Sequence, residues 1–336
     1  MRTAEASSVP GAHRAGPVFT TQAFGLELEL PYDLAALPPR SASACTHRTR
    51  IIDAGRAAVD GVWRGAQAPD RVVDRRLARG RPMLRVEYEP RIGYRIWAPW
   101  HGRYLVSADG STIDAAPPTG SDWGWQRLFF AQVLPLAATL AGLEPLHASA
   151  VARSGYAVAF AAASGTGKTS VAVHLVARGA TLVADDVLAL ESSPDGPIAH
   201  PAAGLIGVAR EQYDGLSAAG RSRLGAVLGE RGKLYLLTKP CDRSLPLIAL
   251  FLLERTEELR ELRVIRLPAP DPRILLASSF INYVRDPRRL RLHLNAHADL
   301  AAKVPVHRVE IPPSAAAAEV APVIEESVDS LLEGRR

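Results

Sequence analysis

Residues 162–169 have the composition of a loop that binds phosphate groups. The stretch reads Ala-Ala-Ser-Gly-Thr-Gly-Lys-Thr and matches the Walker A pattern GxxxxGK[ST], except that Ala162 replaces the first glycine. Glycines in such a loop let successive backbone N–H groups point inward, and the following helix adds the positive end of its dipole. The pattern brings the lysine to the β- and γ-phosphates and the last hydroxyl to Mg²⁺. We therefore predict a nucleotide-phosphate site formed by Ser164, Gly165, Thr166, Gly167, Lys168 and Thr169.

Two carboxylates follow this loop. Asp185 and Asp186 come directly after the short apolar run 181–184. A carboxylate at such a strand end can hold Mg²⁺ opposite the Thr169 hydroxyl, usually through water. The adjacent carboxylate can accept a proton from an attacking hydroxyl. Phosphoryl transfer depends mainly on positioning, so a carboxylate of ordinary pKa can serve as the base if it is well placed. An Asp-Asp pair is otherwise a turn or a helix cap, but its place just after the loop helix favours the functional interpretation.

Lysine usage and one histidine supply further candidates. Only four of the 40 basic residues are lysines, and one of them is Lys168. Lys is a compact point charge and Arg a planar fork, so the two are not equivalent in a phosphate cradle. His147 precedes the strand that enters the loop. A single histidine is more often a hydrogen-bonded core residue than a catalyst, so the residues alone leave its role open.

The elements that must position these residues can be read on both sides of the loop. The apolar run 156–161 is typical of a buried strand. Apolar residues then recur at helical spacing, and Gly179 is placed to end that helix. Strand, loop and helix in this order are what the motif requires, which makes a flexible Ser/Gly turn the weaker interpretation. Ala162 counts against the loop if its backbone needs a positive φ.

Proline and glycine divide the chain near residue 118. Strands are predicted before this point at 24–30, 83–89, 94–98 and 103–107. The charged stretch 71–79 predicts a surface helix that Gly80 ends. We therefore predict a flexible N-terminus over 1–20 and a small sheet-rich N-terminal domain over 21–118.

The remaining residues, 119–336, are predicted to form a P-loop nucleotide-binding domain. Helices are predicted at 121–143, 210–229, 273–285 and 314–332, and buried strands at 234–237 and 247–253. Pro287 is expected to end or kink the third helix. The predicted fold class is α/β with an α+β tendency.

Length and composition exclude several classes of protein. The chain has 336 residues and a formal net charge of +5 that comes from scattered arginines. The densest basic cluster, 285–291, has no interleaved aromatic residues, so we expect a solvated surface and no nucleic-acid partner. No apolar run reaches membrane-spanning length, and the N-terminus does not resemble a signal peptide. Cys45 and Cys241 are far apart and suit a reducing compartment. We therefore expect a cytoplasmic protein with no membrane partner.

Three segments together resemble the HPr kinase/phosphorylase family. They are Leu146–Ser149, the phosphate loop and Val183–Asp186, with His147 lying 22 residues before Thr169 and Asp186 lying 17 after it. The likeness covers about 45 residues and continues more weakly to residue 253. It implies a nucleotide core related to phosphoenolpyruvate carboxykinase. It also implies ATP- and Mg²⁺-dependent phosphorylation of a serine hydroxyl in a peptide or protein.

The resemblance also implies a role for each matching residue. Lys168 would stabilise the phosphates and Thr169 would bind Mg²⁺. Asp186 would be the general base, Asp185 its metal-side neighbour, and His147 an active-site residue. Related kinases are commonly oligomeric, and the sequence leaves the oligomeric state open.

The chain departs from the family after the Asp pair. The Glu-Val-Arg-Gly-Leu-Gly-type signature of the bifunctional members is missing, and the surroundings of Glu211 do not match it. Phosphorolysis is therefore in doubt. The chain is more similar to divergent relatives, some of which phosphorylate a serine of a ribosomal peptide, as in lasso-peptide tailoring. The segment 231–235 is similar to one in such relatives and makes Lys233 a candidate phosphate contact, although an exposed strand-edge lysine explains it equally well.

Two functions of another class compete with a kinase. One is a P-loop ATPase or nucleotide-dependent switch. The sequence has no LSGGQ-like segment, and 238–242 misses the Asn/Thr-Lys-x-Asp motif of GTPases by one residue. The other is a nucleotide-binding scaffold without activity, which Ala162 in the loop would suit. The sequence does not identify a phosphate acceptor.

Overall fold

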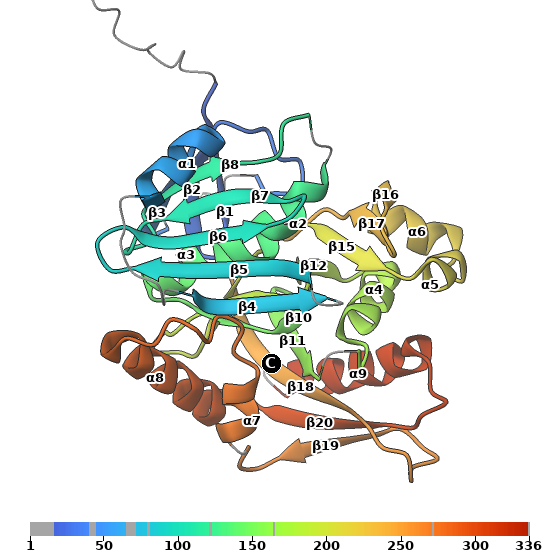
Figure 1. Ribbon diagram of the computed structural model, residues 1–336. Helices are drawn as coiled ribbons and strands as arrows, with labels where there is room; N and C mark the ends of the chain where they lie inside the picture. The colour runs from blue at the N-terminus through green and yellow to red at the C-terminus, as the bar shows by residue number, and fades with distance from the viewer. Residues whose placement is uncertain are drawn as a thin grey trace, which may run out of the picture.

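The computed structural model describes residues 17–39, 45–64, 72–78, 81–120, 123–163, 165–270 and 272–334 (Figure 1). Two large sheets and one small sheet form the framework, with helices packed around them. Among these residues, no helix combines the length and the apolar character that a membrane crossing requires. The predicted flexible segment 1–20 lies almost entirely outside the described residues.

The first sheet has eight strands in the order β1-β2-β3-β8-β7-β6-β5-β4. Their bounds are Phe19–Ala23, Leu26–Leu30, His47–Asp53, Val72–Ala78, Arg81–Glu89, Gly93–Ala98, Gly102–Val106 and Thr112–Ala116 for β1 to β8. Helix α1, Gly55–Arg64, connects β3 to β4. In β2 the leucines are buried and the glutamates between them are half-buried, which is the period-2 pattern of a strand with one covered face.

Two predictions about this sheet need correction. The strand predicted over 24–30 begins at Leu26, because Phe24 and Gly25 both have positive φ and form the turn that joins β1 to β2. The surface helix predicted over 71–79 is wrong, because β4 occupies Val72–Ala78 and pairs antiparallel with β5. Charged residues on β4 suit its place at the sheet edge, where they discourage pairing with another chain.

A continuous helical run connects the two large sheets. It starts with a 3₁₀ turn at Trp123–Trp125, passes through α2, Gln126–Leu128, and a π-helical turn at Phe129–Val133, and ends with α3, Leu134–Ala141. This confirms the helix predicted over 121–143. One hydrophobic cluster contains Leu28 and Ile96 of the first sheet, Phe129 of the helical run and Ala159 of the second sheet. The core therefore continues across residue 118, and the division into domains there stays a prediction.

The second large sheet has nine strands and carries the residues that follow. Strands β12-β10-β11-β18-β14-β13-β9 lie in this order, β20 pairs with β18, and β19 pairs with β20. The bounds are Glu144–Leu146 (β9), Ala148–Arg153 (β10), Tyr156–Ala162 (β11), Thr181–Ala184 (β12), Leu188–Glu191 (β13), Ile198–His200 (β14), Leu245–Arg255 (β18), Arg263–Leu267 (β19) and Val306–Ile311 (β20). Strand β18 runs parallel to both β11 and β20. Buried on both faces, β11 and β18 read as the continuous apolar runs expected of such strands.

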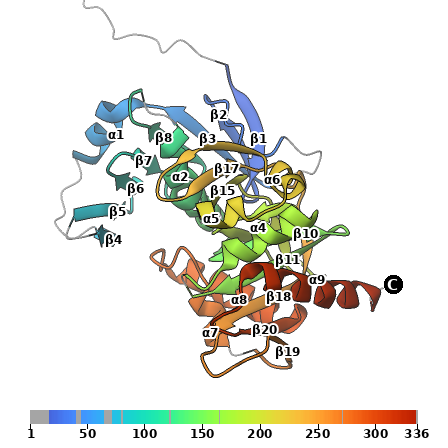
Figure 2. The same ribbon diagram turned by 90° about the vertical axis from the view of Figure 1, so that its right-hand side faces the viewer.

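Helices α4, Lys168–Arg178, and α9, Ala317–Glu333, cover one face of this sheet (Figure 2). Both contribute to a second hydrophobic cluster, which includes Val171 and Leu175 of α4 and Val320 and Ile324 of α9. Gly179 ends α4 in the left-handed conformation, and its N–H bonds to carbonyls of the last turn. The predicted loop helix and C-terminal helix are therefore confirmed.

A small three-stranded sheet stands beside α4. Its strands are β15, Leu205–Val208, β17, Leu234–Leu237, and β16, Ala226–Glu230, in this order, accompanied by α5, Arg210–Asp214, and α6, Ala218–Leu224. The helix predicted over 210–229 is therefore two short helices followed by a strand. A new helix, α6, begins after Ser217, because the Ser217 hydroxyl caps it by accepting the N–H of Gly220.

The helices around Pro287 differ from those predicted. The helix predicted over 273–285 ends at Ala277 (α7, Pro272–Ala277), and Pro287 begins α8, Pro287–Lys303, where its missing N–H costs nothing. The carboxylate of Asp286 caps α8 by accepting the N–H of Arg289. The prediction of a solvated cluster at 285–291 is wrong for Arg289. It is 5% exposed and forms a buried ion pair with Glu144, 2.6 Å from guanidinium to carboxylate.

Candidate active site

The phosphate loop joins the end of β11 to the start of α4. Gly165 and Gly167 have φ values of +84° and +117°, which favour glycine, and Gly167 is the N-cap of α4. Ala162 is the last residue of β11 and is not among the described residues with positive φ. Replacing the first glycine of the motif with Ala162 therefore adds no backbone strain. Ser164 lies outside the described residues.

The ammonium of Lys168 is held at the mouth of this loop. Its side chain is buried, and Nζ donates to the carbonyl of Ala162 and to Nε2 of His147, both at 3.1 Å. Burial lowers the pKa of Lys168, and the charges of Asp186 and Asp185 oppose that shift. The two carboxylates are thus close enough to act on this cation.

Asp185 joins the loop to the end of β12. Its Oδ1 accepts hydrogen bonds from the hydroxyls of Thr169 and Ser149, both at 2.8 Å. Burial, and then the charge of Asp186, raise the pKa of Asp185 to about 7. A divalent cation would relieve this repulsion, and the carboxylate and hydroxyl oxygens are hard ligands of the kind that Mg²⁺ prefers. The residues present therefore fit a Mg²⁺ site.

Asp186 adopts a backbone conformation that few residues share. Its φ is +63°, and its carbonyl oxygen accepts a hydrogen bond from Nδ1 of His147 at 3.0 Å. The side chain is exposed, so its carboxylate is accessible from solvent. Non-glycine residues in this left-handed region are uncommon and are concentrated at functional sites.

His147 connects Lys168 to Asp186. Burial, and then the Lys168 charge, lower the pKa of His147, so the ring is neutral near pH 7. Nδ1 must then carry the proton that it donates to the Asp186 carbonyl, while Nε2 accepts from Lys168. His147 therefore fixes an ammonium and a backbone turn relative to each other, and its contact with Asp186 does not involve the carboxylate.

Buried hydrogen bonds fix the backbone around His147. The preceding strand, β9, begins with Glu144, whose carboxylate binds Arg289 and Nδ1 of His293 on α8, at 2.6 and 3.1 Å. The N–H of His147 donates to the carbonyl of Ser278, 2.6 Å away. Helix α8 and the segment after α7 thus hold β9, and with it His147, in place.

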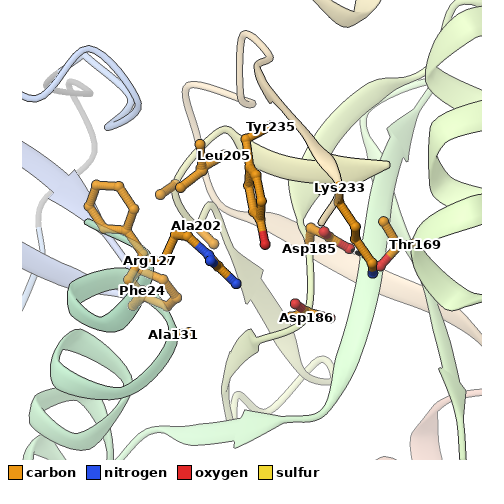
Figure 3. Close-up of a pocket in the computed structure, with 13 residues that line it drawn as sticks. Phe24, Arg127, Ala131, Thr169, Asp185, Asp186, Ala202, Leu205, Lys233 and Tyr235 are labelled. Atoms are coloured by element: carbon orange, nitrogen blue, oxygen red, sulfur yellow. Dashed lines mark hydrogen bonds between the residues drawn. The ribbon is translucent and has the colours of Figure 1, made fainter. Parts of the chain in front are cut away.

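The predicted residues meet at a cavity of about 150 Å³ (Figure 3). Thr169, Asp185 and Asp186 line it, and Lys233 enters from the turn between β16 and β17. In the view of Figure 3, Lys233 and Thr169 are drawn on the same side of the cavity. Lys168 and His147 are joined to this group by the hydrogen bonds given above. Of the predicted site residues that the structure describes, these six therefore form one site, with Gly165–Gly167 at its edge.

Sequence reasoning missed three residues of this site. Ser149 binds Asp185, and its position two residues after His147 was the available signal. Arg127 and Tyr235 also line the cavity. No motif marks Arg127, whereas Tyr235 is the last residue of the segment 231–235 from which only Lys233 was selected. Arg127 comes from α2, far from the loop in sequence, so only the packing of the two sheets brings it here.

A second cavity, of about 490 Å³, lies on the other side of the loop. It is lined by Gly165–Gly167 and by residues that include His174 on α4, Arg255 at the end of β18 and Ala316–Ala318 at the start of α9. Its volume is in the range of small-molecule sites. Glu211 lines this second cavity, and the Asp pair lines the first, so the structure does not bring Glu211 to the carboxylates.

Comparisons with known proteins give little further information. No protein family matches the chain, and no curated protein sequence matches it. Among solved structures, the chain is similar to the Hpr(Ser) kinase/phosphatase from Coxiella burnetii, with 12% sequence identity and a TM-score of 0.32. The match covers 57% of this chain and 99% of that one. A superposition this loose carries no functional argument, so the function must be argued from the residues of the site.

Proposed function

We propose that this protein is a Mg²⁺- and ATP-dependent kinase that transfers the γ-phosphate to a serine hydroxyl of a peptide or protein. One observation carries the proposal. Thr169 at the end of the loop, the Asp185 carboxylate that accepts its hydroxyl, and the exposed carboxylate of Asp186 share one cavity. The resemblance of the segments around His147, the loop and Asp186 to HPr kinase/phosphorylase points to the same reaction.

The nucleotide would lie across the loop. The larger cavity beside Gly165–Gly167 suits the nucleoside, and the phosphates would pass over the N-terminus of α4 towards Lys168 and Lys233. Thr169 and Asp185 would hold Mg²⁺, which when bound neutralises charge on the β- and γ-phosphate oxygens. The two ammonium groups would stabilise the charge of the transferring phosphoryl group.

Asp186 would act as the base on the acceptor side. Its carboxylate would take the proton of the serine hydroxyl while the new O–P bond forms and the bond from the γ-phosphorus to the bridging oxygen breaks. ADP leaves with that oxygen. His147 would be a positioning residue, because it binds the Asp186 carbonyl and the Lys168 ammonium. A cytoplasmic location and an oligomeric assembly stay predictions from the sequence.

Metal binding should depend on pH through Asp185. Because the pKa of this carboxyl is raised to about 7, it holds a proton below that pH, and a metal ion must displace the proton. We expect the affinity for Mn²⁺, used as a spectroscopic substitute for Mg²⁺, to fall about tenfold for each pH unit below 7 and to level off above it. Electron paramagnetic resonance of free Mn²⁺ measures this. Asp185→Asn should bind weakly at every pH, and a flat profile in the unaltered protein would contradict the assignment.

The destination of the γ-phosphate tests the kinase proposal against its alternatives. The protein is incubated with Mg²⁺, γ-labelled ATP and serine-containing peptides and proteins. Label on a serine identifies a kinase, free labelled phosphate alone identifies an ATPase or switch, and intact ATP identifies a scaffold. Lys168→Ala in parallel shows that the label moves through this site.

A further inference from the structure

We propose that Glu144, His293 and His297 form a binding site for Zn²⁺ that clamps helix α8 to strand β9. None of the three lines the phosphate cavity, and no step of the proposed reaction uses them. Glu144 begins β9, whereas the two histidines lie four residues apart on α8. Histidines at this spacing project from one face of a helix, as they do in zinc sites built on a single helix.

The three side chains bring their ligand atoms close together. One nitrogen or oxygen atom of each lies within 4.8 Å of one from both of the others. Among the residues that the structure describes, no other trio of His, Cys, Asp or Glu side chains meets so closely. Oε1 of Glu144 is 3.1 Å from Nδ1 of His293. Ligands around a tetrahedral zinc ion, with bonds of about 2.0–2.1 Å, lie about 3.4 Å apart, so movements of about 1.4 Å at most would close the group around an ion.

The cluster holds more lone pairs than hydrogens to share among them. Nδ1 of His297 lies 2.8 Å from the carbonyl oxygen of His293 and must donate to it, so Nε2 of the neutral ring carries a lone pair. When Nδ1 of His293 donates to Glu144, its own Nε2 carries a second one. The hydroxyl of Ser279 lies 3.1 Å from Nε2 of His297 and 3.5 Å from both ring nitrogens of His293, but it has one hydrogen to donate. A cation between the carboxylate and the two rings would bind the lone pairs that this hydrogen cannot.

The groups around the cluster hold its ligands in the way that partners of bound zinc do. The guanidinium of Arg289 binds Oε2 of Glu144 at 2.6 Å, which leaves Oε1 to the histidines. The bond from His297 to a backbone carbonyl is the usual contact that fixes the orientation of a metal-binding imidazole. Glu144 and His297 are each 3% exposed, whereas His293 is half-buried. An ion would therefore reach the buried ligands from the side of His293.

The donor set selects the ion and gives it a task. Two imidazole nitrogens and one carboxylate oxygen suit Zn²⁺, whereas Mg²⁺ prefers oxygen ligands. The Ser279 hydroxyl or a water molecule would fill the fourth position. Glu144 lies three residues before His147, and Ser279 pairs with Leu146 through the backbone. The ion would therefore hold α8, the segment after α7 and the backbone that carries His147 in one arrangement.

Metal titration of the full-length protein tests the proposal. Protein stripped with a chelator is titrated with Zn²⁺ against a chromophoric competitor, and excess Mg²⁺ competes for the oxygen ligands of the Asp pair. We expect one equivalent of Zn²⁺ to bind, and Co²⁺ in its place to show the strong visible absorption of a four-coordinate ion. His293→Gln and His297→Gln should each weaken binding about 100-fold or more, because even an outer-shell change costs roughly 10- to 100-fold.

His101→Gln is the matched control. The ring of His101 bonds the carbonyl of Pro99 in the turn between β6 and β7, so this variant should bind Zn²⁺ as the unaltered protein does. Should a variant of the cluster fail to fold, the unaltered protein still decides. Zn²⁺ should raise its thermal unfolding midpoint by several degrees and slow amide hydrogen exchange in β9.

Three results would each overturn the zinc site. They are the absence of a bound equivalent, an affinity that both cluster variants share with His101→Gln, and exchange in β9 that Zn²⁺ leaves unchanged. None of these measurements uses ATP or an acceptor. Failure of the kinase proposal would therefore leave their outcome unaffected.

Discussion

Replacing Asp186 with Asn is expected to slow phosphate transfer by about 10²- to 10⁴-fold, the usual contribution of a general base. Asn has nearly the same shape but cannot accept the proton of the acceptor hydroxyl. Asn also tolerates the left-handed backbone that Asp186 adopts at φ +63°, so the turn should be kept. Single-turnover transfer from γ-labelled ATP measures the rate, and equilibrium binding of ATP should be almost unchanged.

A second aspartate supplies the control for this experiment. Asp195 is exposed in a turn and does not line the cavity, so Asp195→Asn makes the same chemical change outside the site. Its transfer rate should equal that of the unaltered protein. Normal turnover in Asp186→Asn would contradict the assignment of Asp186 as the base.

Removing the ammonium of Lys168 is expected to reduce transfer by about a hundredfold or more, through loss of a preorganised charge next to the transferring group. The side chain is only 6% exposed, and two hydrogen bonds already fix its end, so no reorganisation is needed when phosphate arrives. Lys168→Met keeps most of the buried stem volume, whereas Lys168→Ala also leaves a hole. Rates of labelled-phosphate transfer at saturating ATP measure the loss.

Lys239 provides the matched control for the second experiment. It is exposed and lines a separate surface cavity, so Lys239→Met should leave the transfer rate unchanged. Should Lys168→Met transfer phosphate at the rate of this control, the loop would bind nucleotide without contributing to the reaction. A thermal unfolding midpoint for each variant separates lost chemistry from lost folding.

The parts of the site that sequence reasoning found are those governed by local rules. The glycines at 165 and 167 provide the positive φ values of a phosphate loop, and Gly179 ends α4 through its own backbone conformation. Thr169 and Asp185 lie on the elements that begin and end this short unit, so their hydrogen bond follows from its folding. Information within about twenty residues was enough for these predictions.

The failures depend on partners that are distant in the sequence. The segment 72–78 carries a helix-like charge pattern, but an open edge of the first sheet makes it a strand. Arg289 looks like a surface residue until Glu144 is placed beside it. Pro287 can either stop a helix or begin one. Asp286 directly before it is a residue that caps helix N-termini, and this signal for the start of α8 was overlooked. Arg127 and Tyr235 reach the cavity only because two sheets pack together.

The strand order also determines when the site can form during synthesis of the chain. The strand that enters the phosphate loop is flanked by β10 and by β18, and Ala162 lies opposite Leu253. The backbone of His147 is bound to Ser278, and Glu144 is bound to residues of α8. When the loop and the Asp pair have just emerged from the ribosome, the later segments that bind them have therefore not yet been synthesised. Contacts this distant form late because long loops must close first. The nascent chain thus completes the proposed nucleotide site only after most of the protein has been made.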